Sequence, residues 1–220
     1  MCVGMEMLYD KDIREPLFDF LEEVYGKIRI LEEKMMGRSR ADVVMVTPEL
    51  LYGIEIKSDA DSYARLKRQV KDYNLYYDCN YAVAGTSHAM HIGERLPAWW
   101  GIITVELEGG RPDFYILRRP LPNPEVDWKR KISILWRPEL AHIQERNGLP
   151  KYKEKSKLFV QGKLLEKVPG DVLQKQLCDE LFERDYTIIG EQIKQFRRQN
   201  GSEGRRGTRK RKRKSRECPQ

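Results

Sequence analysis

The sequence predicts a mixed α/β fold in which one sheet is packed between helices and followed by a helical segment. Short β-branched and apolar runs of four to eight residues alternate with amphipathic stretches of helical periodicity. Three strand-like runs follow one another before the next helix, which indicates antiparallel hairpins and then a crossover connection. Beyond residue 120 the pattern is helical only. The predicted order of the core is α-β-β-β-α-β.

The first predicted elements are a helix over 11–25 and strands over 27–36, 41–47 and 51–57. In the helix, apolar side chains recur at the spacing of one buried face, and Asp10 or Asp12 is available as its cap. We expect the regular part of this helix to begin only after Pro16.

Residues 61–77 predict a second helix, followed by strands over 80–84, 101–107 and 113–117. A further helical segment is expected from Gly85 to Arg95. Consecutive strands separated by a helix of this length are typical of a parallel pair with a crossover helix.

The chain divides into three predicted regions: an α/β core over 8–120, a helical appendage over 125–196 and a basic tail over 197–220. The tail has 11 basic residues against two acidic ones, whereas the other 196 residues carry 30 basic and 32 acidic groups. The net charge of +7 therefore originates in the tail. Lacking large apolar side chains beyond Gln199, the tail is predicted to be disordered.

A basic tail of this kind favours sequence-independent binding to a phosphate backbone. A nuclear localisation signal and a merely solubilising terminus are the alternatives. The residues predicted to contact nucleic acid here are Arg205, Arg206, Arg209, Lys210, Arg211, Lys212, Arg213 and Lys214.

Composition excludes several classes of protein. No stretch approaches the roughly 18 apolar residues of a spanning helix, so no membrane partner is expected. The four cysteines are scattered without a CxxC pair, which argues against zinc and fits unpaired thiols in a reducing cytoplasm. His88 and His91 share one predicted helix face, and we interpret them as surface residues because no suitably spaced further ligand exists.

An acid and a lysine stand two residues apart in the third predicted strand, at Glu55 and Lys57, and therefore share one face. Asp42 lies in the preceding strand, where an isolated carboxylate among apolar residues is costly unless a cation compensates it. Two carboxylates can hold Mg²⁺ or Mn²⁺, with the Ile56 carbonyl as a further ligand. Lys57 can then orient or deprotonate an attacking water, or stabilise negative charge on a phosphate.

An alternative interpretation makes these groups ordinary surface charges on a solvated sheet face, with Asp42 paired to Arg40 and Glu55 to Lys57. The next helix favours the site: Asp61, Arg65, Gln69 and Tyr73 recur every four residues as a polar stripe facing away from the apolar positions. Arg65 and Tyr73 are candidates for contact with phosphates and bases.

The chain resembles the core motif of the PD-(D/E)xK nuclease superfamily at four places: Arg40-Ala41-Asp42, Gly53-Ile54-Glu55-Ile56-Lys57, Gln69 and Tyr73. The similarity is greatest to small bacterial members of the MmcB-like and VRR-NUC-like kind and covers roughly residues 10–107. It implies a restriction-endonuclease-like fold, Mg²⁺ or Mn²⁺ as cofactor and nucleic acid as substrate. No proline precedes Asp42, which departs from the signature.

Carried over by position, the resemblance makes Asp42 and Glu55 metal ligands, Lys57 the catalytic lysine and Gln69 an active-site helix residue. The acid of the first strand is Glu32 or Glu33, and Glu33 is preferred. The expected activity is a metal-dependent nuclease acting on DNA in repair, defence or mobile-element processing, in a bacterial cytoplasm. RNA as substrate and a homodimer stay open, and a non-catalytic binding module for nucleic acid or protein is the competing function.

Overall fold

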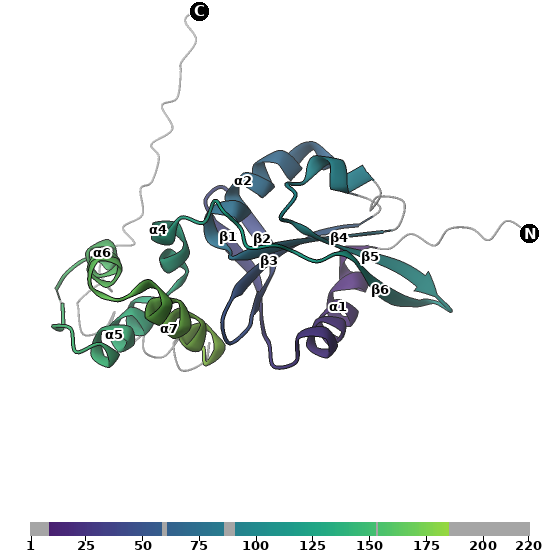
Figure 1. The fold of residues 1–220 in the computed structure, drawn as a ribbon. Coiled ribbons are helices and arrows are strands. Elements are labelled where there is room, and N and C mark those ends of the chain that lie inside the picture. The colour runs from purple at the N-terminus through teal and green to yellow at the C-terminus, as the bar shows by residue number, and fades with distance from the viewer. Residues whose placement is uncertain (1–8, 59–60, 86–90, 153, 185–220) are drawn as a thin grey trace, which may run out of the picture. The chain divides into compact units, whose positions relative to one another are not determined.

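A six-stranded sheet runs through the computed structural model of the protein, with helices on both of its faces (Figure 1). The structure describes residues 9–58, 61–85, 91–152 and 154–184. The strands are β1 (Arg29–Met36), β2 (Ser39–Val46), β3 (Leu51–Lys57), β4 (Cys79–Gly85), β5 (Gly101–Glu108) and β6 (Arg111–Arg118). The helices are α1 (Asp10–Tyr25), α2 (Leu66–Tyr76), α4 (Trp128–Lys131), α5 (Arg137–Arg146), α6 (Lys157–Lys167) and α7 (Gly170–Phe182), with short 3₁₀ turns at Tyr63–Arg65, Gly93–Arg95 and Ile132–Ile134.

The strands lie side by side in sequence order, and their directions make the sheet mixed. β1, β2 and β3 form an antiparallel meander, β3, β4 and β5 run parallel, and β6 returns antiparallel to β5. The parallel β3–β4 pair needs a crossover, which α2 supplies. The mixed α/β class and the predicted α-β-β-β-α-β order of the core are confirmed.

Each face of the sheet has its own hydrophobic core. Side chains such as Val43 and Ile54 pack with α1, whereas Val44 and Leu51 pack with α2 on the other face. Every residue of β3 is buried as a result. The solvated sheet face that the alternative interpretation required is therefore wrong: Glu55 is 1% exposed and Lys57 is 4% exposed.

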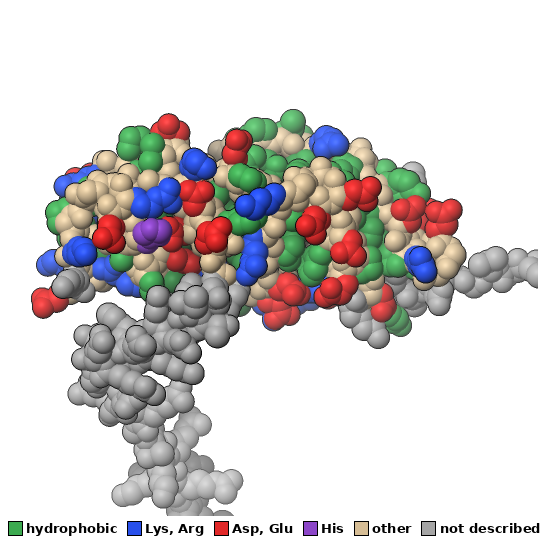
Figure 2. Space-filling view, turned by 90° about the horizontal axis from the view of Figure 1, so that it is seen from below, with side chains coloured by type: hydrophobic (Ala, Val, Ile, Leu, Met, Phe, Trp, Pro, Cys, Tyr) green, Lys and Arg blue, Asp and Glu red, His purple; other side chains and the backbone are tan. Residues whose placement is uncertain are grey.

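Helix α1 departs from its predicted form. It begins at Asp10 and continues regularly through Pro16, which lies inside the helix rather than before its regular part. Asp12 accepts a hydrogen bond from the backbone N–H of Tyr9 at the helix start. The apolar face of α1 rests on the sheet, and Figure 2 shows the molecule from the side that α1 covers.

Close approach of α2 to the sheet depends on Gly53 in β3. A Cβ atom at this position would lie 2.3 Å from the Tyr77 ring and 2.6 Å from the Tyr73 ring. No side chain larger than hydrogen fits there, so the glycine allows Tyr73 of α2 and Tyr77, which follows the helix, to lie directly on the strand. The polar part of β3 follows two residues later.

Helices α4–α7 bring a mostly apolar face to the α2 side of the sheet, where one core joins both regions. Ile132, Leu140, Leu164 and Leu177 belong to the same buried cluster as the residues under α2. The helical character predicted for 125–196 is confirmed as far as Phe182. The tail over 197–220, with the eight basic residues predicted to contact nucleic acid, lies outside the described residues, as does His88.

Among the described residues, no helix has both the length and the apolar character needed to cross a bilayer.

Candidate active site

The ladder between β2 and β3 ends early, and the candidate site lies where the two strands part. Their last register pair is Val43 with Ile54. One residue further, the Asp42 carboxylate takes the place of a backbone acceptor: its Oδ2 accepts a hydrogen bond of 2.9 Å from the Ile56 N–H. A strand residue directs its N–H and its C=O toward the same neighbouring strand. The Ile56 carbonyl therefore points, like the Ile56 N–H, to the place where β2 and β3 part.

The Glu55 carboxylate is the centre of a buried polar cluster under α2. Its Oε1 accepts hydrogen bonds from Lys57 Nζ at 2.6 Å and from Gln69 Nε2 at 2.5 Å. Lys57 Nζ also donates to Gln69 Oε1 at 3.1 Å. The structure therefore brings together Glu55, Lys57 and Gln69 as the sequence predicted. We call these three residues the Glu55 cluster.

Tyr73 connects this cluster to Asp42. Its hydroxyl lies 2.9 Å from Glu55 Oε2 and 3.0 Å from the Ile54 carbonyl, and it accepts a hydrogen bond from the Asp42 backbone N–H at 3.2 Å. Burial, together with the charges of Glu55 and Asp42, raises the pKa of Tyr73 well above its usual value. The phenol therefore stays neutral and acts as a donor.

The predicted nucleic-acid contact of Tyr73 is wrong, since the side chain is 0% exposed. The polar stripe turns toward the sheet at Gln69 and Tyr73, and it faces solvent at the 3₁₀ turn that precedes α2. Arg65 lies there and is exposed. Asp61 accepts hydrogen bonds from the backbone and hydroxyl of Ser58 after β3.

Asp42 is a carboxylic acid whose pKa the site raises. Burial raises its pKa to about 7, and repulsion from Glu55 adds to the shift, whereas the Ile56 N–H and Arg14 oppose it. A nearby cation stabilises the ionised form of such a carboxylate, because the cation offsets both the desolvation cost and the repulsion from the second acid. The electrostatics thus favour cation binding at Asp42.

Arg14 of α1 is the one cation that reaches Asp42 among the described residues. Its guanidinium donates to the Asp42 carbonyl oxygen at 3.2 Å and lies 3.9 Å from Asp42 Oδ1. The same side chain pairs with Asp10 at 2.7 Å and with Glu32 at 3.4 Å. Sequence reasoning missed Arg14 and Asp10; their i, i+4 spacing was visible, but their position over β2 depends on tertiary packing.

The two candidates for the first-strand acid differ in their partners. Glu33 has a positive φ of 51° and pairs with Arg40 at 3.1 Å, at the surface. Glu32 pairs with Arg14 and through it lies near Asp42. The Asp42–Arg40 pair of the alternative interpretation is not formed among the described residues, since Arg40 binds Glu33 instead.

The donor atoms at the opening fit a hard divalent cation. Asp42 and Glu55 supply carboxylate oxygens, and Ile56 supplies a carbonyl; Mg²⁺ commonly takes one or two carboxylates and completes its shell with water and phosphate oxygens. Within the described part of the chain, no three acidic, histidine or cysteine side chains are grouped closely enough to form a complete protein cage.

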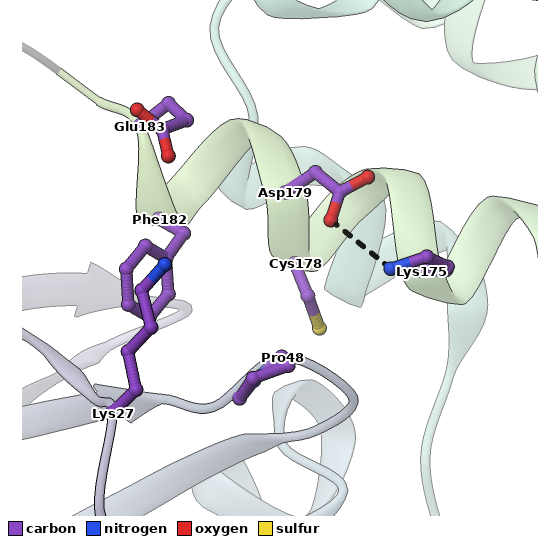
Figure 3. Close-up of a pocket in the computed structure, with 7 residues that line it drawn as sticks. All are labelled: Lys27, Pro48, Lys175, Cys178, Asp179, Phe182 and Glu183. Carbon is purple, nitrogen blue, oxygen red and sulfur yellow. Dashed lines mark ion pairs between the residues drawn. The ribbon is translucent and has the colours of Figure 1, made fainter.

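A pocket of about 290 Å³ lies away from this site, at the opposite end of β3 (Figure 3). Pro48 of the β2–β3 turn lines it together with Cys178 and other residues of α7. Burial raises the pKa of Cys178 to about 12, so the thiol is neutral and a poor nucleophile. The pocket offers no catalytic group to match the Glu55 cluster.

Comparison with curated proteins and with solved structures gave no match. A family model described as bacteriophage P4 protein cII matches residues 5–201. The match spans the sheet, the candidate site and the helices that follow. The chain therefore belongs to the bacteriophage P4 protein cII family.

Proposed function

We propose that this protein is a metal-dependent nuclease that hydrolyses phosphodiester bonds in DNA, built on a restriction-endonuclease-like fold. One observation carries the proposal: Asp42 and the Glu55 cluster meet where β2 and β3 part, beneath α2. The antiparallel meander, the crossover helix and the parallel fourth strand support the fold part of this proposal.

Each residue has a role in this proposal. Asp42, Glu55 and the Ile56 carbonyl would hold Mg²⁺ or Mn²⁺, which supplies a polarised water and neutralises charge on the phosphate. Lys57 lies within hydrogen-bond distance of Glu55, where it can orient the water or stabilise the phosphorane. Gln69 and Tyr73 hold the Glu55 carboxylate in place.

The family favours one of the three settings expected from the sequence. Its description names a bacteriophage protein. We therefore place the proposed activity in the processing of mobile-element DNA, inside a bacterial cell.

A non-catalytic binding module is the second candidate, and the hydrogen bonding of Glu55 favours it. Lys57, Gln69 and Tyr73 all contact this carboxylate without any metal. A polar network satisfied in this way can serve packing alone. Under this alternative the fold would present a surface to nucleic acid or protein and cleave nothing.

Cleavage of labelled duplex DNA in the presence of Mg²⁺ or Mn²⁺ separates the two candidates. The proposal expects cleavage by the wild type, none with EDTA, and a loss of at least roughly 100-fold in Lys57→Met and in Asp42→Asn, as for removal of groups that stabilise a transition state. Lys129→Gln, a change of an exposed lysine on α4, is the control and should cleave normally. No cleavage by a folded wild type under either metal would favour the binding module.

A further inference from the structure

The exposed face of α2 and the turn before it carry only basic charge. Arg65, Lys67, Arg68 and Lys71 are exposed, and none of them forms an ion pair with another described residue. Asp72, the acid in α2, is turned aside and accepts a hydrogen bond from Ser39. We call these four basic residues the α2 basic face.

The β1–β2 turn extends this surface. Tyr76 of α2 accepts a hydrogen bond from the Gly37 backbone N–H at 3.0 Å, and Ser39 bonds Asp72 at 2.5 Å. These contacts fix the turn against α2, and Arg38 at its tip is exposed. The turn thus adds one more exposed cation beside the helix.

The opposite side of the sheet has the opposite charge. Acidic side chains dominate the part of the surface where α1 lies (Figure 2). The exposed acids of α1 are Asp12, Glu15, Asp19, Glu22 and Glu23. A polyanion is attracted to the α2 side and repelled from the α1 side, although the chain outside the tail is almost neutral.

The α2 basic face adjoins the candidate site. Residues three and four apart on a helix are neighbours, so Arg65 lies beside Arg68 and Gln69. Gln69 in turn bonds both Glu55 and Lys57. A phosphate chain lying along α2 would therefore pass the mouth of the site.

Side-chain chemistry indicates which polyanion fits. From Arg65 to Lys71 the helix rises about 9 Å, and duplex DNA carries one charge per about 1.7 Å of its axis, so the two charge densities are similar. Among the described residues, no large apolar or aromatic side chain is exposed on α2. Stacking on single-stranded bases and insertion into a lipid surface both depend on such side chains.

We propose that the α2 basic face binds the phosphate backbone of duplex DNA without reading its sequence, and that it places a phosphodiester at the Glu55 cluster. Only the second half of this inference rests on the proposed nuclease function. Binding through α2 is separate from, and additional to, binding through the basic tail.

The test measures binding of the full-length chain to a fluorescent duplex of random sequence, in EDTA and over a series of salt concentrations. The test variant changes Arg65, Lys67, Arg68 and Lys71 to Gln. A control variant removes the same charge by changing Arg119, Lys129, Arg130 and Lys167, which are exposed on other elements, to Gln. Thermal melts confirm that both variants are folded.

We expect the test variant to lose roughly 100-fold or more in affinity at 0.1 M salt, and its log–log salt dependence to flatten by about 3 to 4, since each lost phosphate contact contributes about 0.9. The control variant should bind nearly as the wild type. Equal losses in the two variants, or no loss in either, would overturn the inference.

The same assay distinguishes this inference from the proposed function. If the wild type never cleaves DNA but the test variant still loses binding, the α2 surface stands and the nuclease proposal fails.

Discussion

Two buried lysines of this chain occupy polar clusters of the same composition at opposite ends of β3. In each, a lysine and a glutamine contact one carboxylate, and the lysine is almost inaccessible to solvent. The residues of the first are Lys57, Glu55 and Gln69, and those of the second, the Asp78 cluster, are Lys131, Asp78 and Gln174.

The Asp78 cluster joins the helical segment to the sheet. Asp78 accepts hydrogen bonds from Lys131, from Gln174 at 3.0 Å and from the Leu51 backbone N–H at 2.9 Å. Lys131 also lies 4.5 Å above the centre of the Trp128 ring. Its contacts tie α4, α7 and the start of β3 together, so we interpret this cluster as structural.

The Glu55 cluster differs by one group, the second carboxylate. Asp42 raises the local negative charge, and its own pKa is raised to about 7. It also lies where the β2–β3 ladder has ended, next to the Glu55 cluster beneath α2. A lysine, a carboxylate and a glutamine in contact therefore do not identify a catalytic site. The second acid, Asp42, is the feature on which the proposed metal site rests.

Breaking the Asp78 cluster should give the largest effect on stability. In Lys131→Met, the partly buried Asp78 carboxylate loses its cation, and breaking a buried pair in this way typically costs about 3–5 kcal/mol. We expect a fall of that size in the free energy of unfolding measured by urea denaturation. A loss below about 1 kcal/mol would show that the cluster does not hold the helices to the sheet.

Removing the charge of Asp42 should raise the free energy of unfolding, which is the opposite of the effect expected for Lys131→Met. The folded pKa of about 7 lies above the ordinary value of 3.8, so ionising Asp42 destabilises the folded wild type, fully above pH 7 and progressively less as the pH falls toward 4. Asp42→Asn should thus raise the free energy of unfolding at pH 8 by up to roughly 4 kcal/mol, at about 1.4 kcal/mol per pKa unit. The gain should shrink below pH 7 and vanish near pH 4.

The matched variant Asp78→Asn should lower the free energy of unfolding at pH 8, because Asp78 has a cation and two further donors. Urea denaturation of both variants at pH 4, 6 and 8 checks the contrast. Destabilisation by Asp42→Asn at pH 8 would mean that its charge is compensated in the folded protein.

The smallest effect concerns two neighbouring tyrosines of the α2 region. Tyr73→Phe removes the hydroxyl that contacts Glu55 and the Asp42 N–H, which should cost about 1–2 kcal/mol. Tyr77→Phe is its control, because the buried Tyr77 hydroxyl has no hydrogen-bond partner among the described residues. Chemical denaturation should show that Tyr77→Phe leaves the free energy of unfolding unchanged or raises it slightly. Equal decreases in both variants would mean that the hydrogen bonds of the Tyr73 hydroxyl add nothing to stability.

Local sequence patterns predicted the strands and most of the site. The alternation around Glu55 and Lys57 and the short hairpin back to Asp42 placed three groups correctly, because strand periodicity and hairpin length are local properties. The inward turn of Tyr73 was not predictable from α2 alone. It depends on the contact of that helix with Gly53, which periodicity does not reveal.

The other contacts that the sequence did not predict join residues far apart in the chain. Arg14 reaches Asp42 from 28 residues away, and Lys131 reaches Asp78 from 53 residues away. Neither pair has a spacing that distinguishes it in the sequence. Burial on both faces of β3 likewise follows from the packing of α2 and the later helices, which turned an apparently amphipathic strand into a fully buried one.

Manganese binding tests the central claim most directly, because it compares the two clusters without requiring cleavage. Electron paramagnetic resonance of free Mn²⁺, titrated with the full-length chain at pH 8, gives the affinity of the wild type, Asp42→Asn and Asp78→Asn. We predict that the wild type binds Mn²⁺, that Asp42→Asn loses at least roughly 10-fold in affinity, and that folded Asp78→Asn binds as the wild type. Equal affinity in all three, or no binding by the wild type, would contradict the assignment of the Glu55 cluster as the metal site.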